Sequence, residues 1–314
     1  MTRLHPALDR FLATVNSVVL GKPDVVEHAV TAVLAGGHIL LEDVPGVGKT
    51  TLAHALARAL GCSFRRIQFT SDLLPSDILG VNVFVPETAG FEFRAGPIFA
   101  NVVLADEINR TTPKTQSSLL EAMNERQVSI DNETRPLPSP FVVIATQNPQ
   151  DFHGTYPLPE SQLDRFMVRL HLGHPTEAVE RAILRGRRGV DPAAGLAPVL
   201  SAEVLVELQA AVGEIRVDEL ILDYLLGIVG QTRRSPQLEL GVSTRGALAL
   251  QRAAQARALL QGRTFVIPDD VKALAVPVLA HRVQVAGATD GLLRANEDAE
   301  RLIQRLVEQV PVPA

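Results

Sequence analysis

The sequence predicts a parallel α/β domain followed by an all-helical domain. Short apolar runs alternate with helix-like segments in the first part of the chain, and a glycine-rich loop directly follows one of these runs. After about residue 174 helical periodicity continues with almost no strand signal. The 314 residues are enough for two domains, which we expect to occupy residues 1–174 and 175–314.

Five apolar runs are expected to form one parallel sheet, because strands that are buried on both faces read as continuous apolar segments. These runs are residues 38–42, 64–69, 101–105, 141–146 and 167–172. Apolar residues at helical spacing predict helices beside and between them, over residues 22–34, 50–60 and 112–123.

Two segments interrupt this alternation and are predicted to be β-hairpins. Residues 79–100 alternate apolar and polar side chains around a Thr-Ala-Gly turn, and residues 127–140 resemble a second hairpin that ends in a proline-rich tract. The later helices are expected over residues 176–188, 202–212, 218–234, 244–260, 268–283 and 296–309. Pro268 followed by Asp269 and Asp270 is typical of a helix start, where acidic side chains meet the positive end of the helix dipole.

A phosphate-binding loop is predicted just after residue 42, at the start of the helix over residues 50–60. The loop consists of Pro45, Gly46, Val47, Gly48, Lys49, Thr50 and Thr51. The last three letters of G-x-x-x-x-G-K-[ST] are present, whereas Asp43 replaces the first glycine. In such a loop backbone N–H groups face the phosphates, Lys49 reaches the β- and γ-phosphates, and the Thr50 hydroxyl ligates Mg²⁺. ATP and Mg²⁺ are therefore the expected ligands.

Two carboxylates follow a second apolar strand. Val102 to Ala105 run directly into Asp106 and Glu107, which is the Walker B arrangement. Asp106 is expected to hold Mg²⁺, and Glu107 is expected to orient and polarise the attacking water. The alternative is a solvated pair of carboxylates at the end of a strand.

A polar residue follows the third apolar strand. Asn148 falls at the carboxyl edge of the sheet, where ligands bind in open α/β folds, and could hold the water or the γ-phosphate. The Asn-Pro dipeptide formed with Pro149 is also a common turn, so the motif alone leaves both interpretations open.

The amino-acid composition argues against several classes of protein. The formal net charge is −5 and no basic run stands out, which disfavours a nucleic-acid-binding surface. Cys62 is the only cysteine, so neither an intramolecular disulfide nor a thiolate zinc cluster can form. No apolar run is long enough for a membrane span, and His5, Asp9 and Arg10 interrupt any signal-peptide core. We therefore expect a cytoplasmic protein.

Taken in order, five tracts of the chain resemble the AAA+ ATPases and, most closely, the MoxR family. The tracts are DVPGVGKTT, VVLADEINR, IATQNP, LPESQLDRF and GVSTRGAL. The tracts DEINRTTPKTQSSLLEAM and GTYPLPESQLDRF make the resemblance specific to MoxR, and it extends from about residue 19 to residue 282. It implies a P-loop AAA+ core with a five-stranded parallel sheet and two hairpin inserts, followed by a helical lid domain.

The resemblance implies a role for each matching residue around the triphosphate. Lys49 and Thr50 match the Walker A lysine and hydroxyl. Asp106 and Glu107 match the Walker B pair. Asn148 matches sensor 1.

Two arginines and one further segment also match the family. Arg165, in LDRF, matches the arginine finger, which reaches the γ-phosphate bound to a neighbouring subunit. Arg245, in STRGAL, matches the sensor 2 arginine of the lid. The segment from Val19 to Gly21 matches the part of the fold near the adenine. Because the lid is displaced in the clade of MoxR, magnesium chelatase and MCM proteins, Arg245 could act on either subunit's nucleotide.

Several basic residues keep competing interpretations. Arg165 and Arg245 could instead form ion pairs at the surface or within the lid. Arg110 could contact phosphate, a neighbouring subunit or its own loop. His281 and Arg282 match a lid segment, where a packing or surface role is at least as well supported.

The resemblance implies a Mg²⁺-dependent ATPase that assembles as a homo-oligomeric ring, expected to be a hexamer. It also implies chaperone-like remodelling or maturation of a client protein, with a von Willebrand A-domain partner. The alternatives are a DNA-acting MCM- or helicase-like motor, a magnesium-chelatase-type motor subunit and a non-catalytic scaffold. The acidic balance disfavours the DNA-acting motor. The presence of Glu107, Asn148 and Arg165 disfavours the scaffold.

Overall fold

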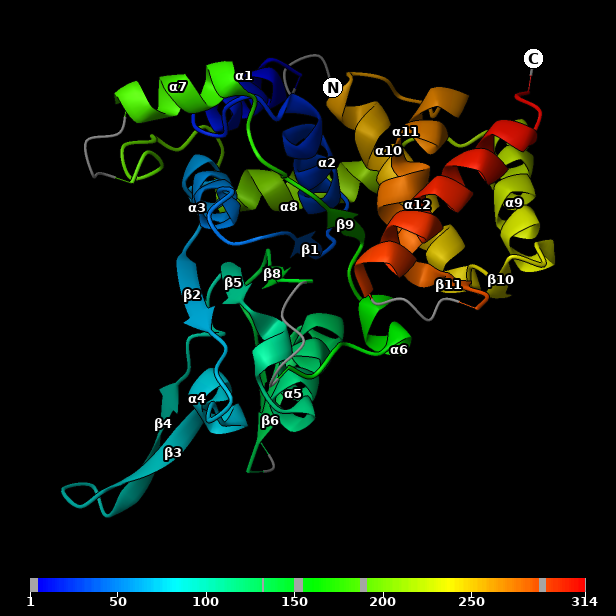
Figure 1. Cartoon of the computed structure of the whole chain (residues 1–314). Coiled ribbons are helices and arrows are strands. Elements are labelled where there is room, and N and C mark those ends of the chain that lie inside the picture. The colour runs from blue at the N-terminus through cyan, green and yellow to red at the C-terminus, as the bar shows by residue number, and fades with distance from the viewer. Residues whose placement is uncertain (1–4, 132, 150–154, 187–190, 288–291, 314) are drawn as a thin grey trace.

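A five-stranded parallel sheet forms the centre of the first domain (Figure 1). The computed structural model describes residues 5–131, 133–149, 155–186, 191–287 and 292–313. The strand order is β2-β5-β8-β1-β9, and every neighbouring pair is parallel. The strands are β1 (Ile39–Glu42), β2 (Phe64–Gln68), β5 (Val102–Asp106), β8 (Val142–Gln147) and β9 (Val168–Leu170). The predicted sheet is therefore confirmed, with bounds that differ by one or two residues.

Helices cover both faces of the sheet, which explains the continuous apolar runs. Along β1, Ile39 and Leu41 pack into one hydrophobic cluster, and Leu40 packs into the other. On the first face lie α1 (His5–Asn16), α2 (Pro23–Leu34) and α3 (Lys49–Ala59). On the second face lie α4 (Pro75–Leu79) and α5 (Pro113–Glu125). The alternation of side chains along a strand thus divides its residues between two cores.

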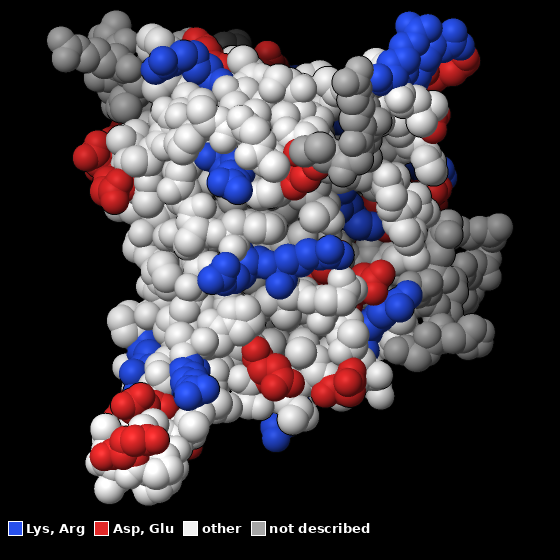
Figure 2. Space-filling model, turned by 90° about the vertical axis from the view of Figure 1, so that its left-hand side faces the viewer, with Lys and Arg blue, Asp and Glu red and all other residues white. Residues whose placement is uncertain are grey.

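Both predicted hairpins are present. The first pairs β3 (Gly80–Val85) with β4 (Gly90–Ala95), and the second pairs β6 (Gln127–Ile130) with β7 (Glu133–Pro136). The β3–β4 hairpin projects away from the body of the molecule (Figure 1). Its outer part carries the exposed residues Glu87 and Glu92, and acidic side chains colour its tip in Figure 2.

Where the structure describes it, the second half of the chain consists of helices and the short strand pair β10–β11. Its helices are α7 (Glu177–Gly186), α8 (Ala202–Gly213), α9 (Glu219–Arg234), α10 (Thr244–Leu260), α11 (Pro268–Leu279) and α12 (Leu292–Gln309). The strands β10 (Leu238–Leu240) and β11 (Gln284–Val285) pair antiparallel, which the sequence patterns did not indicate. Helix α8 packs against α2 as well as α10, so one hydrophobic cluster continues from the sheet into the helical part.

The predicted helix start at Pro268 is confirmed, and Asp270 stabilises it. Its Oδ2 accepts the Ile267 N–H at 2.9 Å, which caps the first turn of α11. The carboxylate is fully buried and pairs with Arg257 at 2.7 Å and Arg263 at 2.6 Å. Because two guanidinium groups compensate its charge, this acidic residue can lie inside the lid.

Among the helices that the structure describes, none combines the length and the apolar character needed to cross a bilayer. The longest of them, α12, buries only one side against the other lid helices.

A buried histidine joins β1 to its neighbours. His38 lies at the start of β1, and its Nδ1 accepts the Val143 N–H at 2.9 Å. Its Nε2 must then carry the proton, which it donates to the Met123 carbonyl at 3.1 Å. Burial lowers the pKa of His38 to about 4, because the ring is held in its neutral form.

Acidification is expected to lower the free energy of unfolding through His38. Since the pKa of this ring is about 4 in the folded chain and 6.5 for an unperturbed histidine, stability present above pH 6.5 is lost as pH falls towards 4. The free energy of unfolding can be measured with denaturant at a series of pH values. Between pH 6.5 and pH 4 it should fall less steeply for His38→Gln than for the unsubstituted chain. Equal slopes would contradict the role given to His38. The comparison of the two chains is needed because the buried ring of His281 also has a lowered pKa and contributes to the pH dependence of stability in both.

Candidate functional site

The carboxyl ends of several strands meet in one polar cavity of about 330 Å³. This is the edge where ligands bind in open α/β sheets. The cavity is lined by Pro45, Gly46, Gly48, Lys49, Thr50, Thr51, Arg66, Asp106, Glu107, Thr146, Gln147 and Asn148. The fold therefore brings the phosphate loop, the Asp-Glu pair and Asn148 together, as the sequence predicted.

The backbone of the loop explains its glycines. Gly46 has φ +88° and Gly48 has φ +105°, in a region that other residues rarely adopt. A Cβ added at either position would meet no atom within 4 Å, so the dihedral angle and not the space requires glycine. Helix α3 begins at Lys49 directly after this turn, so its unpaired first-turn N–H groups border the cavity.

Asp43, which replaces the usual first glycine, anchors the loop. Its Oδ1 accepts the Val44 N–H at 3.0 Å and its Oδ2 accepts the Gly173 N–H at 2.6 Å. Lys49 donates from Nζ to the carbonyls of Asp43 at 2.5 Å and Val44 at 3.1 Å. Burial lowers the pKa of Lys49, while the nearby carboxylates of Asp43, Asp106 and Glu107 oppose this shift. The loop thus supplies the acceptors that hold the ammonium group beside the cavity.

Asp106 is held by two neighbours. The Thr146 hydroxyl donates to its Oδ1 at 2.5 Å, and Arg66 donates to its Oδ2 from Nη2 at 2.5 Å and from Nε at 3.1 Å. Thr146 is fully buried, and its oxygen also accepts the Glu107 N–H at 2.9 Å. One hydroxyl on β8 therefore orients the backbone and side chain at the end of β5.

Glu107 has a left-handed backbone, with φ +58° and ψ 48°. Such a conformation in a residue other than glycine is costly and concentrates at functional sites. Its Oε2 accepts a hydrogen bond from Gln68 at 2.9 Å and pairs with Arg110 Nε at 3.2 Å. Of the three interpretations of Arg110, the structure shows a contact with its own loop.

The residues at the cavity fit a bound Mg²⁺ ion. Asp106 offers a carboxylate and Thr50 offers a hydroxyl, and oxygen donors are what Mg²⁺ prefers. Within the described residues, no group of three or more His, Cys, Asp or Glu side chains could hold a metal ion. One carboxylate and one hydroxyl fit an ion that takes its remaining ligands from phosphates and water.

Three residues of the predicted nucleotide site do not line this cavity. Val47 is half-buried and packs against the hydrophobic cluster of the first face. Val19 is buried in the same cluster. Gly21 has φ +72°, and a Cβ there would lie 2.8 Å from Val179 of α7.

The two arginines matched to the arginine finger and sensor 2 also lie outside the cavity. Arg165 follows α6 (Glu160–Leu163), is half-buried and donates from Nη1 to the Leu120 carbonyl. Its Nε is buried, with no hydrogen-bond partner among the residues that the structure describes. Arg245 is 63% exposed in the first turn of α10, and its Nε lies 3.9 Å from Asp164.

His281 and Arg282 are buried, so the packing interpretation of this segment is confirmed. Arg282 donates from Nε to Asp164 at 2.7 Å and from Nη2 to the Phe166 carbonyl at 2.6 Å. The ring nitrogen Nε2 of His281 lies 3.0 Å from the same carbonyl. Burial lowers the pKa of Arg282 to about 10, although the Asp164 carboxylate opposes the shift. The lid is thus tied to the turn that carries Arg165.

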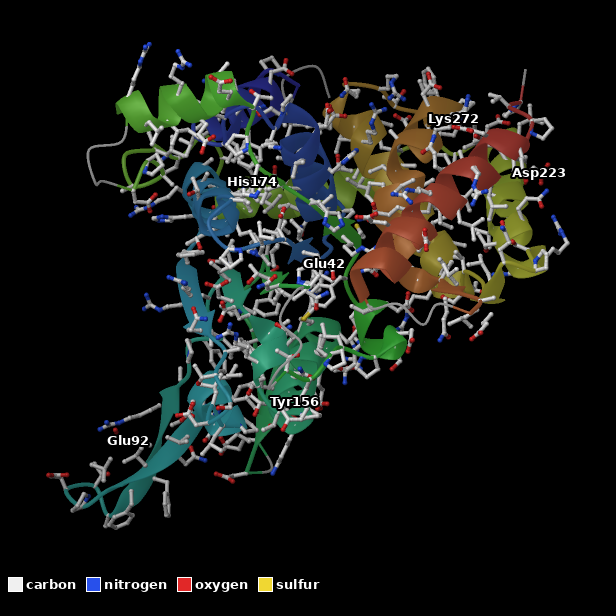
Figure 3. All side chains as sticks on the ribbon, in the orientation of Figure 1. Glu42, Glu92, Tyr156, His174, Asp223 and Lys272 are labelled. Carbon is white, nitrogen blue, oxygen red and sulfur yellow. The ribbon has the colours of Figure 1, made fainter. Side chains whose placement is uncertain are left out.

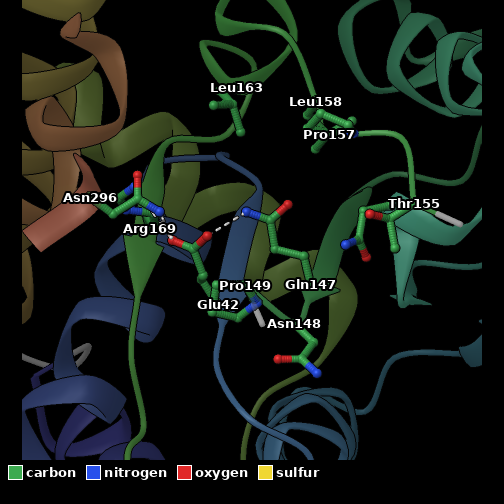
Figure 4. A pocket seen from close by; sticks show the side chains of 11 residues that line it. Glu42, Gln147, Asn148, Pro149, Thr155, Pro157, Leu158, Leu163, Arg169 and Asn296 are labelled. Carbon is green, nitrogen blue, oxygen red and sulfur yellow. Dashed lines mark hydrogen bonds and ion pairs between the residues drawn. The ribbon is translucent and has the colours of Figure 1, made fainter. Parts of the chain in front are cut away.

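A second cavity, of about 190 Å³, lies beside the first and shares Gln147 and Asn148 with it (Figure 4). Its buried carboxylate, Glu42, accepts from Gln147 at 2.7 Å and from Asn296 of α12 at 2.8 Å. Arg169 lies 3.4 Å from the same carboxylate. Figure 3 places Glu42 between the sheet and α12. A polar network therefore joins the strand before the phosphate loop to the lid.

Sequence reasoning missed several residues of these cavities, and four of them carry the contacts described above. They are Arg66, Thr146, Glu42 and Arg169. The available signal was a polar or charged side chain inside or at the end of an apolar strand run, as in HILLE and MVRLHL.

A phosphate loop, a strand-terminal Asp-Glu pair and a helical lid on this strand order define a nucleotide-binding protein of the AAA+ class. Residues 38–168 match the family described as ATPase family associated with various cellular activities (AAA). Residues 230–306 match the AAA lid domain.

Whole-chain relatives identify the family more closely. The uncharacterized protein YeaC of Bacillus subtilis is 48% identical over 99% of this chain and 96% of its own length. Chaperone MoxR1 of Mycobacterium tuberculosis is 40% identical over 98% of this chain and 82% of its own length. A crystal structure from Cytophaga hutchinsonii, provisionally assigned as an ATPase, matches with a TM-score of 0.87 and 34% identity, covering 99% and 96% of the two chains. The chain belongs to the MoxR family of AAA+ ATPases.

Proposed function

We propose that the chain is a Mg²⁺-dependent ATP hydrolase that works as a homo-oligomeric ring and remodels or matures a client protein. The observation that carries the proposal is the meeting of Lys49, Thr50, Asp106 and Glu107 around one cavity. These residue types are the ones that phosphoryl transfer requires, because that reaction depends on positioning and on neutralising charge.

We assign roles in nucleotide binding to the main polar groups of the cavity. The N–H groups of the loop and Lys49 bind the β- and γ-phosphates, with phosphate oxygens replacing the loop carbonyls as acceptors for Lys49. Thr50 and Asp106 hold Mg²⁺, which neutralises charge on the phosphates when it is bound. Asn148 holds the attacking water or the γ-phosphate.

Glu107 is the residue that we assign to the attacking water. Gln68 and Arg110 both contact its Oε2, so Oε1 is the oxygen we assign to the water. The Thr146 hydroxyl holds the Glu107 N–H and thereby supports the left-handed backbone. A carboxylate oriented in this way can accept a proton as the water attacks.

The ring is supported by the positions of the two arginines. Arg165 and Arg245 lie outside the cavity of their own chain, and Asp164 contacts Arg245 and precedes Arg165. Arginines that lie outside their own cavity suit an action on a neighbouring subunit's nucleotide, and a missing arginine is costly in phosphoryl transfer. We therefore assign both arginines to the neighbour's site in a ring, with a hexamer as the proposed size.

The client role rests on relatives. One of them is named a chaperone, which supports a protein substrate, and a von Willebrand A-domain partner belongs to the same proposal. The cytoplasm is the proposed compartment. The division into a core of residues 1–174 and a lid of residues 175–314 stays a prediction.

The proposed function can be tested by capturing the client protein with a chain that binds ATP but does not hydrolyse it. A Glu107→Gln chain is expected to bind ATP without turning it over, and so to retain its client and partner in an ATP-dependent manner. The proteins that co-purify with it from its own cells should be released when ATP is replaced by ADP. Lys49→Ala is the matched control, since it removes a phosphate contact from the same cavity and should retain none of them. Identical sets of bound proteins for the two variants would contradict the proposal.

A further inference from the structure

Arg66 is a basic residue that the edge strand β2 directs into the phosphate cavity. In the sheet it lies opposite Leu104, and Gln68 lies opposite Asp106. Since side chains alternate along a strand, Arg66 and Gln68 share a face while Arg65 points to the other. Figure 2 views the molecule from the side of β2, and basic side chains cross the middle of that face.

The guanidinium of Arg66 contacts the carboxylate that the proposed function gives to Mg²⁺. Two of its nitrogens, Nη2 at 2.5 Å and Nε at 3.1 Å, donate to Asp106 Oδ2. The same Nη2 donates to Gln68 at 3.1 Å, and Gln68 in turn donates to Glu107. One arginine and one glutamine of β2 therefore contact both carboxylates of the Asp-Glu pair.

This arrangement leaves Asp106 with both oxygens engaged. Oδ1 accepts the Thr146 hydroxyl, and Oδ2 accepts two guanidinium bonds. The Asp106 side chain is only 12% exposed, whereas that of Arg66 is 51% exposed and has room to move. A guanidinium and a divalent cation on one carboxylate repel each other, so the binding of one weakens the binding of the other.

We propose that Arg66 is a positioning residue that holds Asp106 in the absence of Mg²⁺ and gives up this carboxylate when Mg²⁺ and nucleotide bind. This inference rests on the proposed function, since it concerns the same nucleotide and metal.

Two opposite effects follow from removing the guanidinium. Without Mg²⁺, the bare carboxylate of Asp106 would face the phosphates and repel them, so nucleotide binding weakens. With Mg²⁺ present, the metal no longer competes with Arg66, so less Mg²⁺ is needed to restore binding. A structural role for Arg66 alone would weaken binding equally at every Mg²⁺ concentration.

The test is a titration with an ATP analogue that carries an N-methylanthraniloyl fluorophore. The chain contains no tryptophan, which leaves the probe's fluorescence as the signal. For Arg66→Gln, the Kd of the probe in EDTA should rise about tenfold, because the charge of the Asp106 carboxylate is then left uncompensated beside the phosphates. The Mg²⁺ concentration at half-saturation should fall relative to the original chain, and the Kd at saturating Mg²⁺ should change less.

Arg65→Gln is the matched control, because it makes the same change on the neighbouring residue of the same strand, which is exposed on the opposite face. It should behave as the original chain does. Arg66→Lys keeps the charge and should retain more metal-free binding than Arg66→Gln, and thermal unfolding checks that each variant is folded.

The outcomes separate the two proposals. Equal EDTA affinities and equal Mg²⁺ midpoints for Arg66→Gln and Arg65→Gln would overturn the inference about Arg66 and leave the proposed function standing. A rise in Kd that is the same with and without Mg²⁺ would also overturn it. An original chain that binds no probe at any Mg²⁺ concentration would overturn both.

Discussion

Replacement of Glu107 by glutamine is expected to lower ATP turnover by about 10²–10⁴-fold while ATP stays bound. Glutamine has nearly the same shape as glutamate, so the loop and the phosphate contacts of Lys49 remain. Its amide cannot accept the proton of the attacking water, and chemistry stops at the bound triphosphate. The left-handed backbone at this position and the Thr146 contact do not depend on the carboxylate.

Steady-state phosphate release measures the turnover, and calorimetry measures whether ATP still binds. Glu121→Gln is the matched control, because it removes the same charge from an exposed position on α5. Its turnover should match that of the original chain. Unchanged turnover in Glu107→Gln would remove Glu107 as the residue that activates water.

Arg165→Ala is expected to lower turnover by about 10³-fold or more, as loss of an arginine finger does. The side chain lies outside the cavity of its own chain, so the defect should appear in the neighbour's site. ATP affinity should change little, because the loop and Lys49 are untouched. Arg181→Ala, on the exposed surface of α7, is the control and should keep full turnover.

Mixing tests whether the Arg165 defect lies between subunits. When Arg165→Ala and Lys49→Ala chains are combined in equal amounts, roughly a quarter of the interfaces in a randomly mixed ring hold an intact loop and an intact arginine. Turnover should then rise above that of either variant alone. Absence of any recovery across all mixing ratios would count against a shared site.

The sheet and both hairpins could be predicted because their signals are local. Apolar runs such as NVVLA are long enough to identify strands, and the Thr-Ala-Gly turn marks the β3–β4 hairpin. The phosphate loop was recognisable despite Asp43, because a strand precedes it and a helix follows it. The β10–β11 pair was missed, since such short strands are decided by packing between distant segments. Helix α1, with 12 residues, was also missed.

The contacts that orient the site could not be predicted from spacing. Thr146 touches Asp106 only because β8 and β5 are neighbours, and Arg66 reaches the same carboxylate from the next strand along. Glu42 and Arg169 pair across β1 and β9 in the same way. A single sequence gives no register between strands, so these partners became visible only in three dimensions.

The measurement that tests the central claim most directly is phosphate release from ATP as a function of protein concentration, with and without Mg²⁺. A shared site predicts Mg²⁺-dependent release whose rate per subunit rises as rings form, and which is lost in Lys49→Ala. A rate per subunit that is independent of concentration, or release that persists in Lys49→Ala, would contradict the account.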